Sequence, residues 1–368
     1  MRVCKNLRIT LLCLLITTCF LLLSNTRQLI MDRKKTFVLC ALLLLLFIGA
    51  LWTLLAGPTP FSDVWSGVQK RISGLDNSWN PLLDERLPRL ITILCTGASL
   101  ATAGTVMQTL FRNPLASPSV LGLPAGAALC VLFCFLLNIQ HLYPWMLSLS
   151  AFCGCFFTLL FIYSVSRLFS LNDMNALVLT SIALATVLTA SLQTILYALR
   201  ANWNLVQSMS EWMVGATVDR NWQHVHMQVP LTIYGLLGCY SYRHELNILC
   251  LGDEEASNLG IDVPKVRWHL FIWVSMLVSG AVAAMGNIAF FGLILPNILR
   301  TILGPNIRTL IPFSIFVGAA TLLYLDIFLR FFQVTVLSIG NIFALLGGVY
   351  FLVVLIQYQQ QRKGLVVC

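Results

Sequence analysis

The amino-acid sequence predicts an all-α membrane protein that crosses the bilayer about ten times, and two observations carry this prediction. Only 23 Lys and Arg plus 14 Asp and Glu residues are charged, where a soluble chain of this length would carry roughly 90 such residues. Hydrophobic residues make up 58% of the 368 residues, and the mean hydropathy is +0.85. So few charges cannot cover a core of this size, and lipid is expected to cover most of the exterior.

Ten apolar stretches are long enough, or nearly so, to cross the bilayer, because a spanning helix needs about 20 predominantly apolar residues. The predicted spans are Thr36–Ala56, Leu90–Phe111, Leu121–Ile139, Tyr143–Val165, Asn175–Leu199, His224–Tyr242, Trp268–Gly286, Ala289–Leu303, Leu310–Leu329 and Ile339–Tyr358. The eighth span is short and contains Gly292 and Pro296, which indicates a broken helix whose freed backbone groups line a cavity or pair with protein.

The distribution of basic residues predicts the orientation, because positively charged loops tend to remain in the cytoplasm. With ten spans and a cytoplasmic N-terminus, most of the 23 Lys and Arg residues fall on the cytoplasmic side, and so does the C-terminus. Seven basic residues fall on the opposite side, against this bias: Lys70, Arg71, Arg200, Arg220 and the three that recur below, Arg86, Arg89 and Arg330. The positive-inside bias does not explain the location of these three arginines, which suggests that they have a function there.

The chain is predicted to divide into an N-terminal extension, a membrane domain and a short tail. Residues 1–36 form the extension, in which Ile9–Leu23 is short for a span and is followed by no signal-peptide cleavage site. Met31 is an alternative start, since Met-Asp-Arg-Lys-Lys leads directly into the first span. The membrane domain covers residues 37–358 with a cytoplasmic loop over 243–267, and residues 359–368 form a cytoplasmic tail.

The sequence predicts no catalytic, metal or nucleic-acid site. The 12 cysteines have no paired C-x-x-C spacing, and the five His residues lie at span ends or in loops. Lys and Arg are scattered singly between apolar blocks, unlike the clustered basic face of a nucleic-acid-binding protein. There is no G-x-x-x-x-G-K-[ST] phosphate loop, so ATP hydrolysis is expected only from a separate partner. No catalytic residue, metal ligand or cofactor is therefore assigned.

Three segments carry more information than hydropathy does. They are Arg86-Leu-Pro-Arg89 continuing to Arg112-Asn-Pro-Leu-Ala-Ser-Pro118, then Leu251-Gly-Asp-Glu-Glu-Ala-Ser-Asn-Leu-Gly260, and Phe290-Phe-Gly-Leu-Ile-Leu-Pro296 continuing through Asp326-Ile-Phe-Leu-Arg330 to Ile339-Gly-Asn-Ile-Phe-Ala-Leu-Leu-Gly347. In this order, and in register with ten spans, they resemble the FecCD-type permease subunits of the iron-chelate and cobalamin importers, an ATP-binding-cassette family of ten-helix permeases. The resemblance covers nearly all of residues 37–358.

The resemblance implies a function, partners and a location. Such importers contain two identical or related permeases, cytoplasmic ATP-binding subunits and a periplasmic substrate-binding protein, and they lie in the bacterial inner membrane. The implied function is import of a ferric siderophore or related iron chelate, with haem or cobalamin as alternatives. The residues by themselves leave an ion-coupled secondary transporter as a rival, because broken helices and a midplane cavity serve that class equally well.

The resemblance also implies two functional sites. The ATPase-coupling segment lies within the predicted 243–267 loop and comprises Gly252, Asp253, Glu254, Glu255, Ala256, Leu259 and Gly260. Its two outer glycines bracket a stretch that can form a short helix, with acids in the first turn where the helix dipole favours them. On the opposite side, Arg86, Arg89 and Arg330 match arginines that receive carboxylates of the binding protein, a role that suits the planar guanidinium.

One acid stands apart from the others. Asp326 lies well inside a predicted span, where a charged side chain costs roughly 3 kcal/mol on insertion scales. It precedes Arg330 by four residues, which is the favourable order for an ion pair on a helix. We expect a structural pair in which Asp326 orients Arg330, rather than a proton relay.

Overall fold

The computed structural model describes residues 37–55, 65–69, 73, 79–139, 143, 145–168, 174–215, 220–332 and 338–366, and the regular structure within these ranges is entirely helical. The chain forms two compact units, Met1–Phe47 and Ile48–Cys368. The predicted extension over residues 1–36 and its alternative start at Met31 lie outside the described residues. Of the first unit, only the beginning of the helix Phe37–Leu55 is described.

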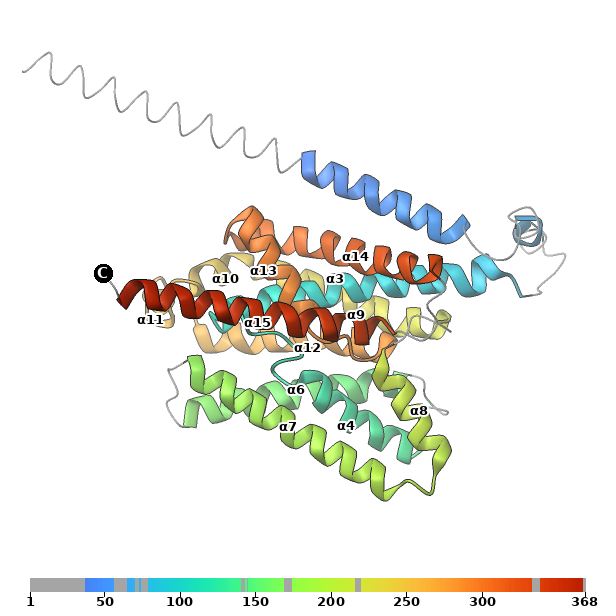
Figure 1. Ribbon diagram of the computed structural model, residues 1–368, viewed down its shortest axis with the longest axis horizontal. Helices are drawn as coiled ribbons and strands as arrows, with labels where there is room; N and C mark the ends of the chain where they lie inside the picture. Colours follow the sequence, from blue (N-terminus) through green and yellow to red (C-terminus); the bar gives the residue numbers. More distant parts are fainter. Residues whose placement is uncertain are drawn as a thin grey trace, which may run out of the picture. The chain divides into compact units, whose positions relative to one another are not determined.

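The second unit is built from helices that run mainly along one direction (Figure 1). After the end of the Phe37–Leu55 helix, the main elements in order are the short π-helix η1 (Pro81–Arg86), α3 (Leu87–Leu110), α4 (Leu123–Leu136), α6 (Trp145–Leu168), α7 (Met174–Ala198), α8 (Trp203–Val214), α9 (Trp222–Ser241), α10 (Arg243–Leu249), α11 (Asp253–Asn258), α12 (Val263–Met285), α13 (Phe291–Leu303), α14 (Ile307–Phe331) and α15 (Ile339–Val366).

Each of the ten predicted spans falls on a helix. Within the described residues, six helices are long and apolar enough to cross a membrane: Phe37–Leu55, Pro81–Leu110, Met146–Val165, Leu179–Ala198, Val263–Met285 and Ile307–Phe331. Shorter apolar helices at Leu123–Leu136, Phe291–Leu303 and Ile339–Tyr350 correspond to the third, eighth and tenth predicted spans. The sixth predicted span is α9, which is more polar because His and Gln residues occupy its first two turns. An all-α polytopic membrane protein is thus confirmed.

Helix α3 is the most deeply packed of these spans, and small side chains let its neighbours approach closely. The α3 span is 83% buried, against 17% for the α7 span. Gly97 of α3 packs against Gly318 of α14, and Gly104 packs against the backbone of Gly292 in α13. A Cβ atom at Gly97 or Gly104 would overlap the facing carbonyl group. The small residues of this span therefore serve close helix packing, as predicted for a membrane bundle.

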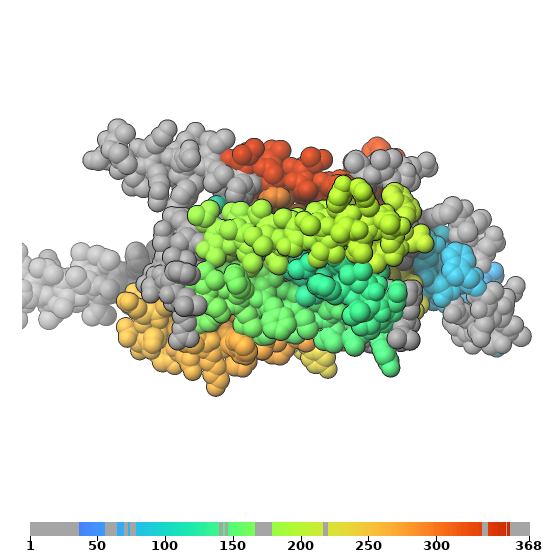
Figure 2. Space-filling model, turned by 90° about the horizontal axis from the view of Figure 1, so that it is seen from below, coloured from blue at the N-terminus to red at the C-terminus, as the bar shows by residue number. Residues whose placement is uncertain are grey.

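Helices α4, α6 and α7 form a second group, which packs beside α12 (Figure 1). Gly126 of α4 and Gly154 of α6 lie against each other's backbone, so these two helices also approach through small residues. Helix α7 packs on α4 and leaves its other side open, with Leu179 and Val187 exposed. Figure 2 shows α7 and α8 spread over this face, with α4 next to them.

The predicted break in the eighth span lies before the helix rather than inside it. Helix α12 ends at Met285, residues 286–290 are not helical, and Phe290 has a left-handed backbone with φ of 59°. Helix α13 then continues unbroken through Pro296. Because Pro296 has no N–H, the carbonyl of Gly292 loses its helical donor, and Gly104 of α3 packs on this carbonyl. The proline is therefore accommodated without a break.

Two stretches outside the ten predicted spans contain helices, of which the sequence predicts only the short one between Gly252 and Gly260. Helix α8 follows α7 in the region between the fifth and sixth predicted spans, and it buries Met209 while Trp203 is exposed. The predicted 243–267 loop is helical over most of its length, because it contains α10, α11 and the first turn of α12. These helices are too short to be recognised by hydropathy, which detects segments of about 20 residues.

The contact between α3 and α13 predicts opposite effects for two glycine substitutions. Gly104→Ala should destabilise the protein by about 1–3 kcal/mol, because the new methyl group overlaps the Gly292 carbonyl. Gly348→Ala in α15 should be neutral or stabilise by up to about 1 kcal/mol, because no atom lies within 4 Å of its Cβ position and alanine favours the helix. Thermal unfolding in detergent measures both effects, and equal shifts for the two variants would contradict this packing.

Candidate functional site

One buried carboxylate binds two arginines where α3 begins and α14 ends. Asp326 is completely buried. Its Oδ1 lies 2.6 Å from Nη2 of Arg89, and its Oδ2 lies 3.2 Å from Nε of Arg330. We call these three residues the arginine triad. With two guanidinium groups and one carboxylate, the arginine triad carries one net positive charge.

The triad is assembled by the antiparallel packing of α3 and α14. Gly97 faces Gly318 and Thr105 bonds to Ser314, so the start of α3 lies beside the end of α14. The four-residue spacing on α14 brings Arg330 to Asp326, whereas Arg89 arrives from a helix more than 200 residues earlier in the sequence. No local pattern could have predicted this third member, because the α3–α14 register alone places it.

The triad retains hydrogen-bonding capacity. Within the described residues, nothing accepts a hydrogen bond from Nη2 of Arg330, although this atom is buried. The side chains of Arg89 and Arg330 are 13% and 28% exposed. A buried guanidinium donor without an acceptor is costly, and an incoming carboxylate could supply that acceptor through a charge-assisted hydrogen bond.

Arg86 occupies a different environment from the other two predicted docking arginines. Its side chain is buried, and its Nη1 lies 2.9 Å from the carbonyl of Leu54 and 3.3 Å from that of Leu55. The last carbonyls of a helix lack intrahelical donors, so Arg86 satisfies the end of the Phe37–Leu55 helix. Arg86 is thus not one of the two arginines that bind the Asp326 carboxylate.

The predicted ATPase-coupling segment forms the short helix α11 between two glycines with left-handed backbone. Gly252 has φ of 139° and Gly260 has φ of 85°. Ala256 is completely buried, whereas the neighbouring Glu254 and Glu255 are exposed. Leu259 is 62% exposed. An exposed apolar side chain beside two exposed acids, on a helix too short to span a membrane, is suited to contact with another protein.

The acids of this segment do not all face the same way. Asp253 contacts two arginines of the chain itself: Nη2 of Arg267 lies 2.9 Å from its carboxylate oxygens, and Nη2 of Arg112 lies 3.5 Å from its Oδ1. Glu254 and Glu255 have no ion pair among the described residues. Among the predicted coupling residues, Asp253 thus contacts the permease itself, whereas Glu254, Glu255 and Leu259 are exposed.

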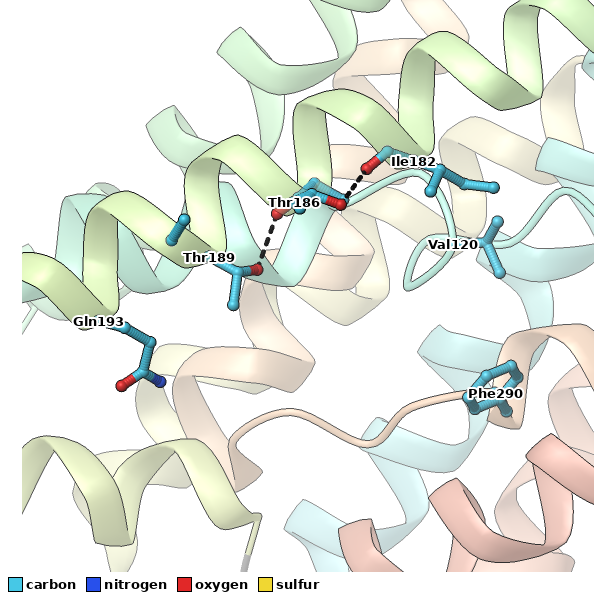
Figure 3. A pocket seen from close by; sticks show the side chains of 8 residues that line it. Val120, Ile182, Thr186, Thr189, Gln193 and Phe290 are labelled. Carbon is cyan, nitrogen blue, oxygen red and sulfur yellow. Dashed lines mark hydrogen bonds between the residues drawn. The ribbon is translucent and has the colours of Figure 1, made fainter.

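A hollow of about 590 Å³ lies along the open side of α7. It is lined by Val120, Ile182, Ala185, Thr186, Thr189, Ala190, Gln193 and Phe290. The hydroxyls of Thr186 and Thr189 donate to the carbonyls of Ile182 and Ala185 at 2.8 Å and 2.7 Å. In Figure 3, the α7 side chains form one wall of the hollow, and Phe290 comes from the segment before α13. Because both hydroxyls donate within their own helix, this wall is mainly apolar.

The described residues offer no metal centre. They contain no group of three or more His, Cys, Asp or Glu side chains that could hold a metal ion. The cysteines among the described residues are free thiols, of which Cys134, Cys155 and Cys239 are buried.

A polytopic bundle with a charged site at one end of its central helix and an exposed helical segment beyond the other end defines the chain as a membrane permease. The chain matches the FecCD transport family over residues 40–357. It is 33% identical over 335 residues to the hemin transport system permease protein HmuU of Yersinia pestis, covering 88% of this chain and 96% of that protein. The chain therefore belongs to the FecCD transport family, whose members are permease subunits and not enzymes.

Two further comparisons agree with this assignment. The chain is 35% identical over 278 residues to the Fe(3+) dicitrate transport system permease protein FecD of Escherichia coli strain K12, covering 75% of this chain and 85% of that protein. A solved structure described as an inward-facing conformation of a metal-chelate type ABC transporter superposes with a TM-score of 0.72 at 28% identity. That match covers 87% of this chain and 99% of the solved chain.

Removing the buried carboxylate should destabilise the protein. Asp326→Asn leaves two guanidinium groups without their shared counter-charge, and breaking such a buried pair costs about 3–5 kcal/mol. Glu211→Gln provides a matched acid-to-amide control, because Glu211 is exposed and accepts a hydrogen bond from Gln207 of its own helix. Thermal unfolding in detergent should separate the two variants by several degrees. Similar unfolding temperatures would contradict a structural role for Asp326.

Proposed function

We propose that the chain is the permease subunit of a binding-protein-dependent importer that moves a ferric siderophore, or a related iron chelate, across the bacterial inner membrane. The observation that carries this proposal is the placement of two different sites along α3. The arginine triad lies at its first turn, and α11 contacts the chain just after its last turn. A partner on each side of the membrane fits this arrangement, and family membership supports it.

On the outer side, the arginine triad would receive an acidic surface of a periplasmic binding protein. The exposed parts of the Arg89 and Arg330 side chains can donate to a carboxylate, and the net positive charge of the triad attracts it. Arg86 would contribute indirectly, because it fixes the end of the Phe37–Leu55 helix through the carbonyls of Leu54 and Leu55. We therefore retain all three arginines in the docking site, with contact roles for Arg89 and Arg330.

On the inner side, α11 and its flanking residues would seat on a cytoplasmic ATP-binding subunit. Leu259 offers an exposed apolar contact, and Glu254 and Glu255 offer exposed charges. The positive φ of Gly252 and Gly260 sets the chain direction on both sides of the helix. ATP binding and hydrolysis in the partner would then move α11, and the bundle would alternate its access between the two sides.

The cargo would pass along the open side of α7, opposite a second permease that is either identical or related. The wall lined by Thr186, Thr189 and Phe290 is mainly apolar. Apolar walls with few polar groups suit the organic surface of a chelate better than a hydrated ion. Hemin and Fe(3+) dicitrate, for which two relatives are named, both contain iron bound by an organic ligand. Haem is therefore the second candidate cargo and cobalamin the third.

An uptake measurement tests the proposed cargo. The chain is reconstituted in liposomes with its ATP-binding subunit, its partner permease and its binding protein, and ⁵⁵Fe-labelled siderophore, labelled haem and labelled cobalamin are offered in turn. We expect ATP-dependent uptake of the ferric siderophore that is insensitive to a protonophore. Uptake of haem or cobalamin alone would replace the proposed cargo, and loss of uptake on collapse of the proton gradient would favour a secondary transporter.

A charge substitution tests the docking site. Arg330→Glu should weaken binding of the loaded binding protein about tenfold or more, because a carboxylate then faces a carboxylate. Arg330→Lys should show a smaller loss, since it keeps the charge without the planar fork. Arg200→Glu is the matched control, because Arg200 is predicted to lie on the same side but bonds to Tyr197 of its own segment. Equal affinities for the Arg330→Glu and Arg200→Glu complexes would rule out docking at the triad.

A further inference from the structure

The inner end of the bundle contains an ion-pair arrangement that the proposed partners do not explain. Asp253, the first residue of α11, is held by Arg267 of α12 at 2.9 Å and by Arg112, which follows α3, at 3.5 Å. We call these three residues the Asp253 clamp. The carboxylate that would be expected on the outer surface with Glu254 and Glu255 is thus directed towards the permease itself.

The backbone around the clamp is shaped to make these contacts. Arg112 has φ of 47°, a left-handed conformation that is uncommon for a residue other than glycine. Gly252 has φ of 139°, and a Cβ atom there would overlap the Glu255 carboxylate and lie 3.5 Å from Nη1 of Arg112. Strained backbone persists where the surrounding structure holds it in place, and it gathers at functional sites. Here the strained residue is Arg112, whereas Gly252 adopts its positive φ without strain because it has no Cβ atom.

Stability does not account for the clamp. The side chains of Arg112 and Asp253 are 36% and 39% exposed, and exposed ion pairs contribute little to folding free energy. Burial of Ala256 in α11 and of Leu246 and Leu249 in α10 already attaches this region to the bundle. What the clamp adds is direction, because two guanidinium groups, one on α12 and one in the turn after α3, fix one carboxylate from two sides.

The two helices that the clamp joins lead into the centre of the protein. Helix α3 has 24 residues, and so extends about 36 Å; Arg112 lies two residues beyond its last residue, at the end opposite to the arginine triad. Helix α12 packs against α3, α6 and α9. A displacement of the first residue of α11 would therefore act on the most buried helix of the bundle and on the helix that links its two groups.

We propose that the Asp253 clamp is the joint through which movement of the ATP-binding subunit passes into α3 and α12, with Arg112 and Arg267 as positioning residues. This inference rests on the proposed function, because it needs an ATP-driven partner on α11. It divides the acids of the segment between two tasks: Asp253 connects α11 to the permease, while Glu254 faces the partner. Glu255 is also exposed, but its carboxylate lies back against Gly252. A joint of this kind couples ATP hydrolysis to transport without contributing to partner binding.

The experiment compares Asp253→Asn and Arg112→Gln with the parent in the complete reconstituted importer. Asparagine and glutamine remove the charges at nearly constant size. We expect both variants to retain the ATP-binding subunit and the thermal stability of the parent complex, and to transport about tenfold less cargo per ATP hydrolysed, within the usual range of couplings between sites. Asp253→Glu, which keeps the carboxylate, should recover part of this ratio. Arg243→Gln is the matched control, because Arg243 is a partly exposed arginine at the same end, and its guanidinium contacts the nearby Tyr240 and not Asp253.

The outcomes separate failure of the clamp from failure of the proposed function. A parental ratio of transport to hydrolysis in Asp253→Asn would overturn the clamp, and so would a loss of the ATP-binding subunit that matches the loss of transport. Gly260→Trp, which alters the outer side of the segment, should release the ATP-binding subunit. If Gly260→Trp leaves that subunit bound, or if the parent complex shows no ATP-dependent uptake, then the proposed function fails, whatever the clamp variants do.

Discussion

Close backbone packing of α3 against its neighbours is the constraint on which the rest of the structure depends. Lipid gives helices no hydrophobic reason to associate, so contact requires small residues and paired polar groups. Glycines supply the approach at Gly97 and Gly104. Hydroxyl and amide groups add hydrogen bonds between helices, at 2.7 Å from Thr105 to Ser314 and at 3.1 Å from Gln108 to the Leu293 carbonyl. A helix held so closely on several sides is suited to carry displacement along its length.

The charged residues are placed by this packing and not by their own attraction. Because α3 and α14 are locked in antiparallel register, Arg89 reaches a carboxylate that is completely buried, and the cost of burying Asp326 is offset by two guanidinium groups. At the other end, the chain leaves α3 through a left-handed residue and meets α11. The same helix thus begins at the proposed docking site for an outer partner and is followed by the proposed joint with the segment that would bind an inner one.

In contrast to the closely packed α3, helix α7 is largely exposed on one side. Its span is 17% buried, and its threonine hydroxyls are satisfied within the helix at Thr186 and Thr189. Such a surface can face lipid, a second permease or a chelate without leaving donors unpaired. The contrast between a packed α3 and an open α7 separates the part of the bundle that is proposed to transmit movement from the part that is proposed to contact cargo.

By itself, the sequence determined the membrane class, the ten helical segments and the pairing of Asp326 with Arg330, because hydropathy and four-residue spacing are local properties. The Gly252 and Gly260 pair likewise indicated a short helix between them. The tertiary structure decided which arginine joins the buried carboxylate, that Arg86 binds the end of another helix, and that Asp253 faces inward while its neighbouring acids face outward. These features depend on which residues of distant helices share one end of the bundle, and helix register is fixed by packing across the whole chain, which no local pattern contains.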